Sequence, residues 1–302
     1  MKIIRARISG FCMGVRRAVN MASGAVSLKK NIYTLGPLIH NSGVLKNLEQ
    51  MNIRVLDDKL PGSGLTLIPE NSAVIIRAHG IPPDLEKSYS EKGIEILDAT
   101  CPHVKTSQKK ASEYAGRGYC IFLAGEKDHA EIAGIRGYIE AAGQPANCGT
   151  FCVGSAAEAE KAAFELANSR PEAKTVLIGQ TTIGPDEYSD IGTSVRRYFP
   201  NLEIIDSICG STAERQQALR ELCGAADAII VAGGRESANT RRLYTLANDL
   251  GKPCWLLESP EEIPREIYRY ENIGITAGAS TPENLVDQIE KALLLQYIEF
   301  RE

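Results

Sequence analysis

Three cysteines occupy the same place in a repeated stretch of this 302-residue chain. Cys101 ends the string IEILDATC and Cys209 ends LEIIDSIC, and both strings place an aspartate three residues before the thiol. A looser copy, IIRARISGFC, ends at Cys12 and has Ser9 where the other copies have aspartate. Each string is a β-prone run that stops before a helical pattern, over residues 3–8, 95–97 and 203–205. Each thiol is therefore predicted to lie at a strand-to-helix turn.

The spacing after each thiol is repeated as well. Twenty-four residues beyond each cysteine, a glycine closes a second apolar run: Gly36, Gly125 and Gly233. Four residues after each glycine comes a polar side chain: His40, His129 and Ser237. Late in each copy, polar residues stand shortly before a proline that fits the start of a helix: His79, Thr181 with Thr182, and Ser280. Self-similarity at fixed spacing predicts three copies of one structural unit.

The alternation of strand and helix patterns predicts an α/β fold built from parallel sheets. The repeat divides the chain into three small α/β domains: residues 13–100, residues 101–208, and residues 1–12 with 209–302, the last ending in a helical tail. Ligands bind where loops leave the carboxyl ends of parallel strands. If a pseudo-threefold axis relates the domains, the three thiols and the repeated polar positions converge on one central cavity.

The residue types at these positions suggest a metal site beside an anion site. Three thiolates are one short of the four ligands that iron–sulfur clusters and structural zinc take, so one metal position would stay open for substrate. Three of the four histidines lie at repeated positions. The turn from Gly233 to Asn239 precedes a predicted helix, whose N-terminus favours anions such as a small phosphorylated substrate. Glu131 is either a proton donor beside His129 or a solvated glutamate at a helix start.

Composition excludes several classes of partner. With 34 basic and 38 acidic residues the net charge is −4, which argues against nucleic acid. The longest apolar runs are far shorter than the roughly 20 residues of a membrane helix, and the chain begins with a strand pattern and no signal peptide, so we expect a cytoplasmic protein and no membrane partner. Of the remaining cysteines, Cys120 and Cys254 are expected to be buried, and Cys148 with Cys152 is a weaker candidate for a second metal site.

Taken together, the motifs resemble one enzyme family along the chain from Ile8 to Leu285. The motifs are Gly10-Phe-Cys12-Met-Gly-Val, Ala78-His79-Gly, Asp98-Ala-Thr-Cys101-Pro, His129-Ala-Glu131, Gln180-Thr-Thr182, Ile208-Cys209 and Ser237-Ala-Asn239. The chain is similar in these motifs to the LytB-type 4-hydroxy-3-methylbut-2-enyl diphosphate reductases, the last enzymes of the methylerythritol phosphate route to isoprenoids.

The resemblance implies a trefoil of three α/β domains around a [4Fe-4S] cluster that is held by Cys12, Cys101 and Cys209 and keeps one iron open. It implies a diphosphate site made by six side chains: His40, His79, His129, Ser237, Asn239 and Ser280. Glu131, with Thr181 and His129, would form the catalytic group that passes a proton to the leaving hydroxyl. The implied reaction is reductive dehydroxylation of 4-hydroxy-3-methylbut-2-enyl diphosphate to isopentenyl and dimethylallyl diphosphate. The electrons would come from ferredoxin or flavodoxin.

The chain departs from the family pattern at two turns. Ala238 stands where the family often has a second serine, and Gly210-Ser211 follows Cys209 where the family usually has an alanine before the threonine. Two other functions are also compatible with three thiols at an open site. One is a zinc hydrolase with a metal-bound water, and the other is an iron–sulfur redox sensor.

Overall fold

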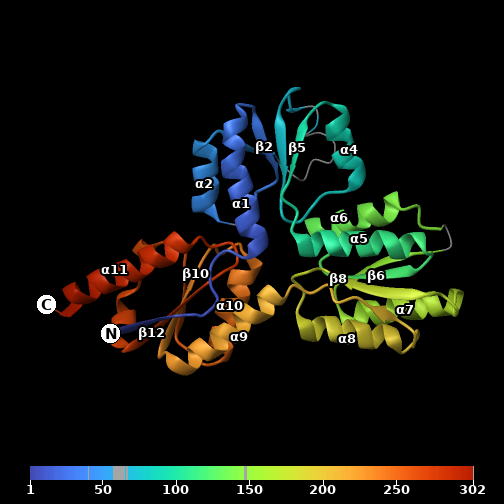
Figure 1. Cartoon of the computed structure of the whole chain (residues 1–302). Coiled ribbons are helices and arrows are strands. Elements are labelled where there is room, and N and C mark those ends of the chain that lie inside the picture. The colour runs from blue at the N-terminus through green and yellow to red at the C-terminus, as the bar shows by residue number, and fades with distance from the viewer. Residues whose placement is uncertain (40, 57–64, 66, 146–147, 302) are drawn as a thin grey trace. The chain divides into compact units, whose positions relative to one another are not determined.

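The computed structural model describes residues 1–39, 41–56, 65, 67–145 and 148–301. Three parallel sheets of four strands each carry the fold (Figure 1). The first contains, in spatial order, β3 (Ile53–Leu56), β2 (Ile32–Leu35), β4 (Ala73–Ile76) and β5 (Glu95–Asp98). The second contains β7 (Thr150–Val153), β6 (Cys120–Ala124), β8 (Thr175–Gly179) and β9 (Glu203–Ile204). The third contains β11 (Cys254–Leu257), β10 (Ala228–Ala232), β12 (Asn272–Ala277) and β1 (Lys2–Arg5).

The three sheets share one strand order, which confirms the predicted α/β class with parallel sheets. In each sheet the strand that ends at the repeated glycine lies second, as β2, β6 or β10. The strand that leads to the repeated cysteine lies at one edge, as β5, β9 or β1. All neighbouring pairs run parallel, for example β6 with β8 from Cys120 beside Thr175 to Ala124 beside Gly179. The repeat seen in the sequence is thus a repeat of supersecondary structure.

Helices connect the strands. They are α1 (Met13–Ala25), α2 (Ser42–Gln50), α4 (Pro83–Glu91), α5 (Pro102–Gly116), α6 (Ala130–Ala141), α7 (Ala156–Ser169), α8 (Pro185–Arg196), α9 (Gly210–Ala225), α10 (Ala238–Asp249) and α11 (Glu283–Arg301). Short 3₁₀ turns span Val26–Leu28, Pro260–Glu262 and Arg265–Arg269. The predicted helix starts are confirmed at Pro83 and Pro185, where proline stands first and acidic side chains fill the first turn. No helix in the described ranges is long and apolar enough to cross a membrane.

The chain divides into two compact units. The first unit comprises Met1–Asn20, Pro37–Met51 and Gly210–Glu302, and the second comprises Met21–Gly36 and Asn52–Cys209. The second unit therefore holds two of the three sheets. The strands of each sheet come from one of the three predicted domain ranges, and the division into three domains remains a prediction.

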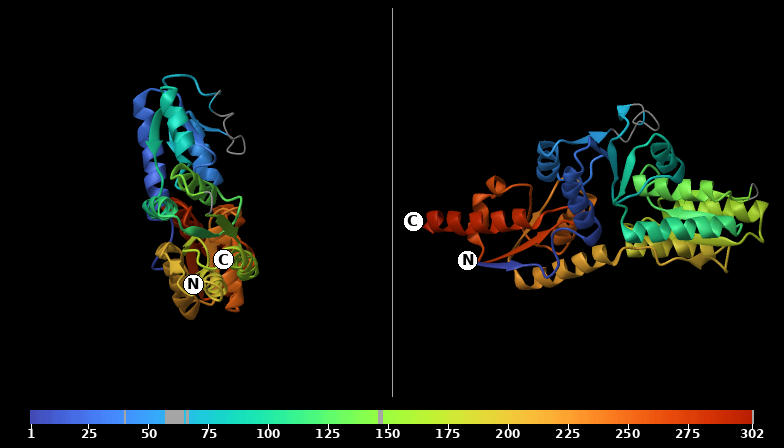
Figure 2. Two further views of the ribbon diagram at one scale, coloured as in Figure 1. Left: turned by 90° about the vertical axis from the view of Figure 1, so that its right-hand side faces the viewer. Right: turned by 45° about the horizontal axis from the view of Figure 1, so that its top comes forward.

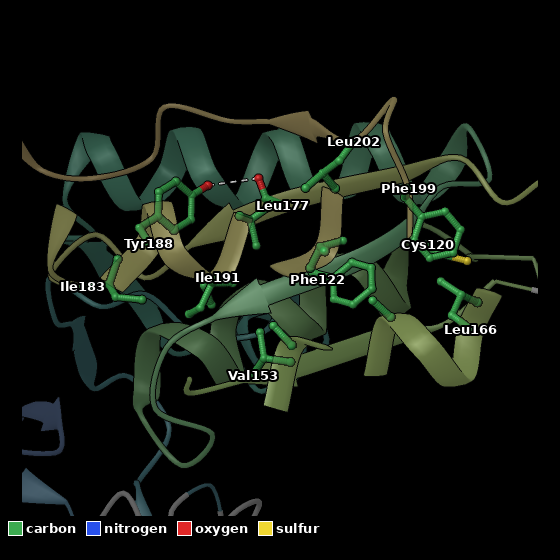
Figure 3. Close-up of a cluster of buried hydrophobic side chains, with 14 residues drawn as sticks. Cys120, Phe122, Val153, Leu166, Leu177, Ile183, Tyr188, Ile191, Phe199 and Leu202 are labelled. Carbon is green, nitrogen blue, oxygen red and sulfur yellow. Dashed lines mark hydrogen bonds between the residues drawn. The ribbon is translucent and has the colours of Figure 1, made fainter. Parts of the chain in front are cut away.

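The second sheet shows how the sequence builds a layer that is buried on both faces. Helices α5 and α6 cover one face, and α7 and α8 cover the other (Figures 1 and 2). Because successive strand residues point to opposite faces, Ile121 and Leu123 of β6 join the core under α5 and α6. Phe122 joins the opposite core, where the Tyr188 hydroxyl donates to the Leu177 carbonyl at 3.1 Å (Figure 3). Truncating a buried phenylalanine such as Phe122 to alanine costs about 3–5 kcal/mol of folding free energy.

The third sheet, in the first unit, is organised in the same way. Ile230 and Ala232 of β10 pack with α11 on one face, while Ile229 and Val231 pack with α9 and α10 on the other. Continuous apolar strands of this kind are typical of parallel sheets that helices cover on both sides. The rigid layers leave the carboxyl ends of the strands as the edge where polar side chains gather.

Candidate active site

Each repeated cysteine is fixed by the same backbone hydrogen bond. Its N–H donates to a carbonyl just beyond the end of the neighbouring strand. The pairs are Cys12 with Ala279 (3.1 Å), Cys101 with Ala78 (2.9 Å) and Cys209 with Thr181 (2.7 Å). The looser N-terminal copy, whose strand β1 ends at Arg5 and not at the predicted Ile8, makes this bond as the others do. The predicted equivalence of the three cysteine turns is therefore a property of the backbone.

All three thiols lie immediately before the first residue of a helix, at Met13, Pro102 and Gly210. Each cysteine is partly exposed, and the Val15 N–H donates to the Cys12 sulfur at 3.4 Å. Helix N-termini favour thiolates, so the donor set suits a cationic metal group. Cys101 and Cys209 belong to the second unit and Cys12 to the first. Among the described residues no three His, Cys, Asp or Glu side chains are grouped around a metal position, and the three-thiolate site stays a prediction.

The second set of polar positions lies on a turn that is also built three times. In each copy the N–H of the turn's fourth residue donates to the carbonyl of its first, at 3.0 Å. The pairs are Gly80 to Arg77, Ile183 to Gln180, and Thr281 to Gly278. Counting along this turn, the equivalent of His79 and Ser280 is Thr182. Thr181 corresponds instead to the residue whose carbonyl receives the cysteine N–H, which the sequence alone did not distinguish.

The repeated glycines end their strands in another shared contact. Gly36, Gly125 and Gly233 each donate an N–H to the last residue of the adjacent strand, at 2.9–3.0 Å. A Cβ on Gly125 would lie 2.6 Å from the side-chain amide oxygen of Gln180 and 2.7 Å from the Gln180 Cβ, and φ at this glycine is +152°, so glycine is strongly favoured here. Four residues on, His129 caps α6 and Ser237 caps α10. His40, the matching residue of the first copy, lies outside the described residues.

His79 and His129 meet although they follow strands of different sheets. Their ring centroids are 5.0 Å apart and the ring planes stand at 83°, an edge-to-face arrangement. The Nδ1 atom of His129 accepts the N–H of Glu131 at 3.2 Å, which leaves Nε2 of this ring directed away from the helix cap. Two imidazoles at adjacent strand ends can donate hydrogen bonds to one anionic group.

Glu131 is buried, so it is not the solvated glutamate that one interpretation of its sequence context predicted, and its role as a proton donor stays a prediction. Only 1% of the residue is exposed. One carboxylate oxygen accepts the Thr181 N–H at 2.7 Å and the other pairs with the Thr181 hydroxyl at 2.9 Å. Burial raises the pKa of Glu131 to about 7, and the two hydrogen bonds from Thr181 act in the opposite direction. A carboxyl group with this pKa can deliver a proton near neutral pH.

In the first unit, Ser237, Asn239 and Ser280 gather at the ends of β10 and β12. The Ser280 hydroxyl donates to the Ser237 hydroxyl at 3.1 Å, and both side chains are buried. The amide nitrogen of Asn239 is buried and has no hydrogen-bond acceptor within the described ranges. Nearby Arg235 forms ion pairs with Glu258 and Glu262, and these carboxylates neutralise its charge. The donors that this turn could offer to an anion are therefore neutral.

Cys148 and Cys152 lie on different sides of the second sheet. Cys148 packs against the core beneath α7 and α8, and its thiol donates to the Gly118 carbonyl at 3.1 Å. Cys152 packs against the opposite core, and burial raises the pKa of its thiol. Cys120 is buried as predicted, and burial raises the pKa of the partly exposed Cys254 to about 12. Their packing is that of small apolar side chains.

Sequence patterns missed three residues that support the candidate site. The Gln180 side chain accepts the Glu126 N–H at 3.0 Å and donates to the Thr182 hydroxyl at 2.9 Å. Arg215, buried in α9, donates to the Gly10 carbonyl at 2.8 Å, two residues before Cys12. Lys105 forms an ion pair with Asp98 ahead of Cys101. Gln180 did stand in the motif Gln180-Thr-Thr182, but the sequence assigned it no role. A single arginine or lysine in a helical pattern gives no indication of a site.

Comparison with known proteins places this geometry in context. A family model described as "LytB protein" matches residues 3–294. A Treponema denticola protein named 4-hydroxy-3-methylbut-2-enyl diphosphate reductase is 40% identical over 299 residues, which cover 97% of this chain and 99% of that protein. A protein of the same name from Aquifex aeolicus is 32% identical over 293 residues, 96% of this chain and 95% of that protein.

Two solved structures have the same fold. One is (E)-4-hydroxy-3-methyl-but-2-enyl diphosphate reductase, described as the terminal enzyme of the non-mevalonate pathway. It matches with a TM-score of 0.76 and 31% identity over 97% of this chain and 99% of that chain. The other, an E-1-hydroxy-2-methyl-but-2-enyl-4-diphosphate reductase from Plasmodium falciparum, matches with a TM-score of 0.81 and 28% identity over 97% of this chain and 87% of that one.

Proposed function

We propose a function from one premise: the chain belongs to the LytB protein family. It is a 4-hydroxy-3-methylbut-2-enyl diphosphate reductase, which removes the allylic hydroxyl of that substrate reductively. The products are isopentenyl and dimethylallyl diphosphate, precursors of isoprenoids. The names of full-length relatives at 32–40% identity support this function over a zinc hydrolase or a redox sensor.

The observation that carries the proposal is the buried carboxyl group of Glu131. Loss of a hydroxyl as water requires a proton, and a carboxyl with a pKa of about 7 is protonated often enough at neutral pH to supply one. Thr181 fixes both carboxyl oxygens, and His129 accepts the Glu131 N–H at the start of the same helix. These contacts keep the proton on the Glu131 carboxyl group, in a fixed position that solvent does not reach.

The proposed diphosphate ligands are histidines and neutral donors. His79 and His129 would offer ring N–H groups, and Ser237, Asn239 and Ser280 would offer hydroxyl and amide donors. The buried amide nitrogen of Asn239 is free to donate to a phosphate oxygen. His40 completes the set by its place in the repeat. Charge-assisted hydrogen bonds of this kind contribute about 1.5–3 kcal/mol each to binding.

The thiolates of Cys12, Cys101 and Cys209 would hold a [4Fe-4S] cluster with one iron open, which supplies electrons and a Lewis-acid position when bound. Their common backbone bond and their place at helix N-termini support this assignment. A ferredoxin or flavodoxin would deliver the electrons, and the enzyme would act in the cytoplasm without nucleic acid or membrane partners.

The direct test is turnover by anaerobically purified protein supplied with a strong one-electron donor. We expect the hydroxylated diphosphate to be consumed and both five-carbon diphosphates to form. A protein that carries an intact cluster but leaves the substrate unchanged would favour the redox sensor. A colourless protein that contains zinc and no acid-labile sulfide would favour the hydrolase.

A further inference from the structure

The contact between His79 and His129 requires that loops from two different sheets of the second unit lie close together. His79 follows β4 of the first sheet and His129 follows β6 of the second, yet their rings touch edge to face. The loop that carries His79 runs on to Pro82 and α4, and α4 packs against α6. The placement of His79 therefore depends on how closely this loop approaches α6.

The loop lies directly against two glycines of α6, and at Gly137 there is no room for a side chain. A Cβ on Gly137 would overlap the Pro82 side chain and lie 2.9 Å from the Pro82 Cα. A Cβ on Gly134 would lie 3.5 Å from the His79 carbonyl oxygen. The loop backbone thus rests directly on the helix surface, and at Gly137 any side chain would lift it away.

Gln108 fills the corner beneath the same loop. This residue lies on α5, which packs beside α6 (Figures 1 and 2). Gly80 has a φ of +74° and lies against the Gln108 amide. A Cβ on Gly80 would overlap Nε2 of Gln108 and lie 3.1 Å from the Thr100 methyl carbon. The same Nε2 atom would lie 3.1 Å from a Cβ on Gly134. The Gln108 side chain therefore touches the loop and both helices at once.

The Gln108 side chain is buried, and its contacts depend on its shape. It is 2% exposed, and its Nε2 has no hydrogen-bond acceptor in the part of the chain that the structure describes. A buried donor without an acceptor is unfavourable, so the amide itself adds no stabilising contact. An apolar side chain of the same shape would avoid this penalty and fill the same corner.

We propose that Gln108 is a positioning residue: wedged between Gly80 and Gly134, its side chain holds the His79 turn against α6, so that His79 faces His129. The role deepens the proposed function, because it rests on His79 as a diphosphate ligand. Gly137 has a complementary role, because the absence of a side chain there lets the loop lie directly on α6. Neither residue touches substrate, and both act through the orientation of His79.

The first test reads the orientation of His79 without any assay of activity. The full-length chain has four histidines, so the ring signals of ¹⁵N-histidine-labelled protein can be assigned by replacing His79 and His129 singly. The edge-to-face contact shifts the protons of one ring by the ring current of the other. We expect Gln108→Ala and Gly137→Ala to abolish this shift. The matched controls Lys109→Ala, on an exposed side chain of α5, and Gly116→Ala, which meets no atom within 4 Å, should leave it unchanged.

The second test measures binding of inorganic diphosphate to the same proteins by calorimetry. We expect Gln108→Ala to weaken binding about tenfold, the loss of part of one charge-assisted hydrogen bond. Gln108→Met keeps the shape of the side chain, so it should restore both the ring-current shift and the affinity. An unchanged shift in Gln108→Ala, or an equal loss in Gln108→Met, would overturn the proposal.

The two tests also separate this inference from the proposed function. If His79→Ala binds diphosphate as the parent protein does, His79 is not a diphosphate ligand and that part of the proposed function fails. A ring-current shift lost in Gln108→Ala would then still support the positioning role. The converse result is that His79→Ala abolishes binding while Gln108→Ala changes neither readout. It would support His79 as a diphosphate ligand and contradict the positioning role of Gln108.

Discussion

The second unit and the first unit present polar side chains on the same backbone turn, but with different chemistry. In the second unit the positions carry two imidazoles, His79 and His129, and the buried Glu131, whose pKa is raised by burial to about 7. In the first unit Ser237, Asn239 and Ser280 are neutral donors, and the nearby Arg235 is held by two glutamates. A repeated fold thus fixes where a side chain lies, while the residue type decides whether that position carries an ionisable group or a neutral donor.

Glu131→Gln is expected to have the largest effect, because it removes the proton donor of the second unit and keeps its shape. An amide can pair with the Thr181 N–H and hydroxyl as the protonated carboxyl does. We expect turnover to fall by about 10²–10⁴-fold while the cluster spectrum and substrate binding persist. Glu140→Gln, on an exposed side chain of the same helix, is the matched control. Loss of the cluster in Glu131→Gln would contradict the assigned role.

Stability should also depend on the proton of Glu131. Its pKa is about 7 in the folded chain against a model value of 4.5, so the folded state keeps a proton that the unfolded chain releases. The stabilising contribution is complete below about pH 4.5 and is lost as the pH rises through about 7, a change of about 3 kcal/mol. Glu131→Gln should therefore be more stable than the parent protein at pH 8 and equal to it at pH 4.5. Denaturant unfolding at the two pH values measures this, and equal differences at both would refute it.

His79 and Ser280 lie at the same position of the repeated turn, so replacing each tests whether both kinds of donor bind substrate. His79→Gln in the second unit and Ser280→Ala in the first should each raise KM about tenfold, the loss of about one hydrogen bond to a charged group. Steady-state kinetics of the two variants and the parent protein checks this. A KM that stays unchanged in either variant would remove that side chain from the proposed set of ligands.

Ala238→Ser is expected to have the smallest effect. Ala238 is the first residue of α10 and is exposed, next to the capping hydroxyl of Ser237. One more hydroxyl there competes with water, so we expect KM to change by less than about threefold. A larger gain in affinity would mean that the first unit binds the diphosphate incompletely without this serine.

The repeat carried most of the prediction of the fold, because equal spacing constrains the backbone more than any single motif does. It located the cysteine turns, the glycine strand ends and the helix starts at Pro83 and Pro185. The predicted strand over residues 3–8 was too long, since the pairing of β1 with β12 stops at Arg5 beside Ile275. The local sequence of that copy gave no sign of the earlier end.

The candidate site was predicted less completely, because it depends on contacts between distant segments. Glu131 is buried by the turn around Thr181, fifty residues away in sequence, and no periodicity in α6 announces that contact. Gln108 belongs to an ordinary helical pattern, and only the approach of the His79 loop makes it unusual. Residue type and spacing predict where side chains stand on their own elements, but not which of them a neighbouring element will bury.

The three repeated cysteine turns are proposed to hold one open iron–sulfur cluster. The most direct measurement is the visible and paramagnetic-resonance spectrum of the anaerobically purified protein, recorded with and without 4-hydroxy-3-methylbut-2-enyl diphosphate. We expect broad visible absorption, iron and acid-labile sulfide in equal amounts, and a spectrum of the reduced protein that changes when substrate is added. A colourless protein, or a cluster spectrum that the substrate leaves unchanged, would contradict it.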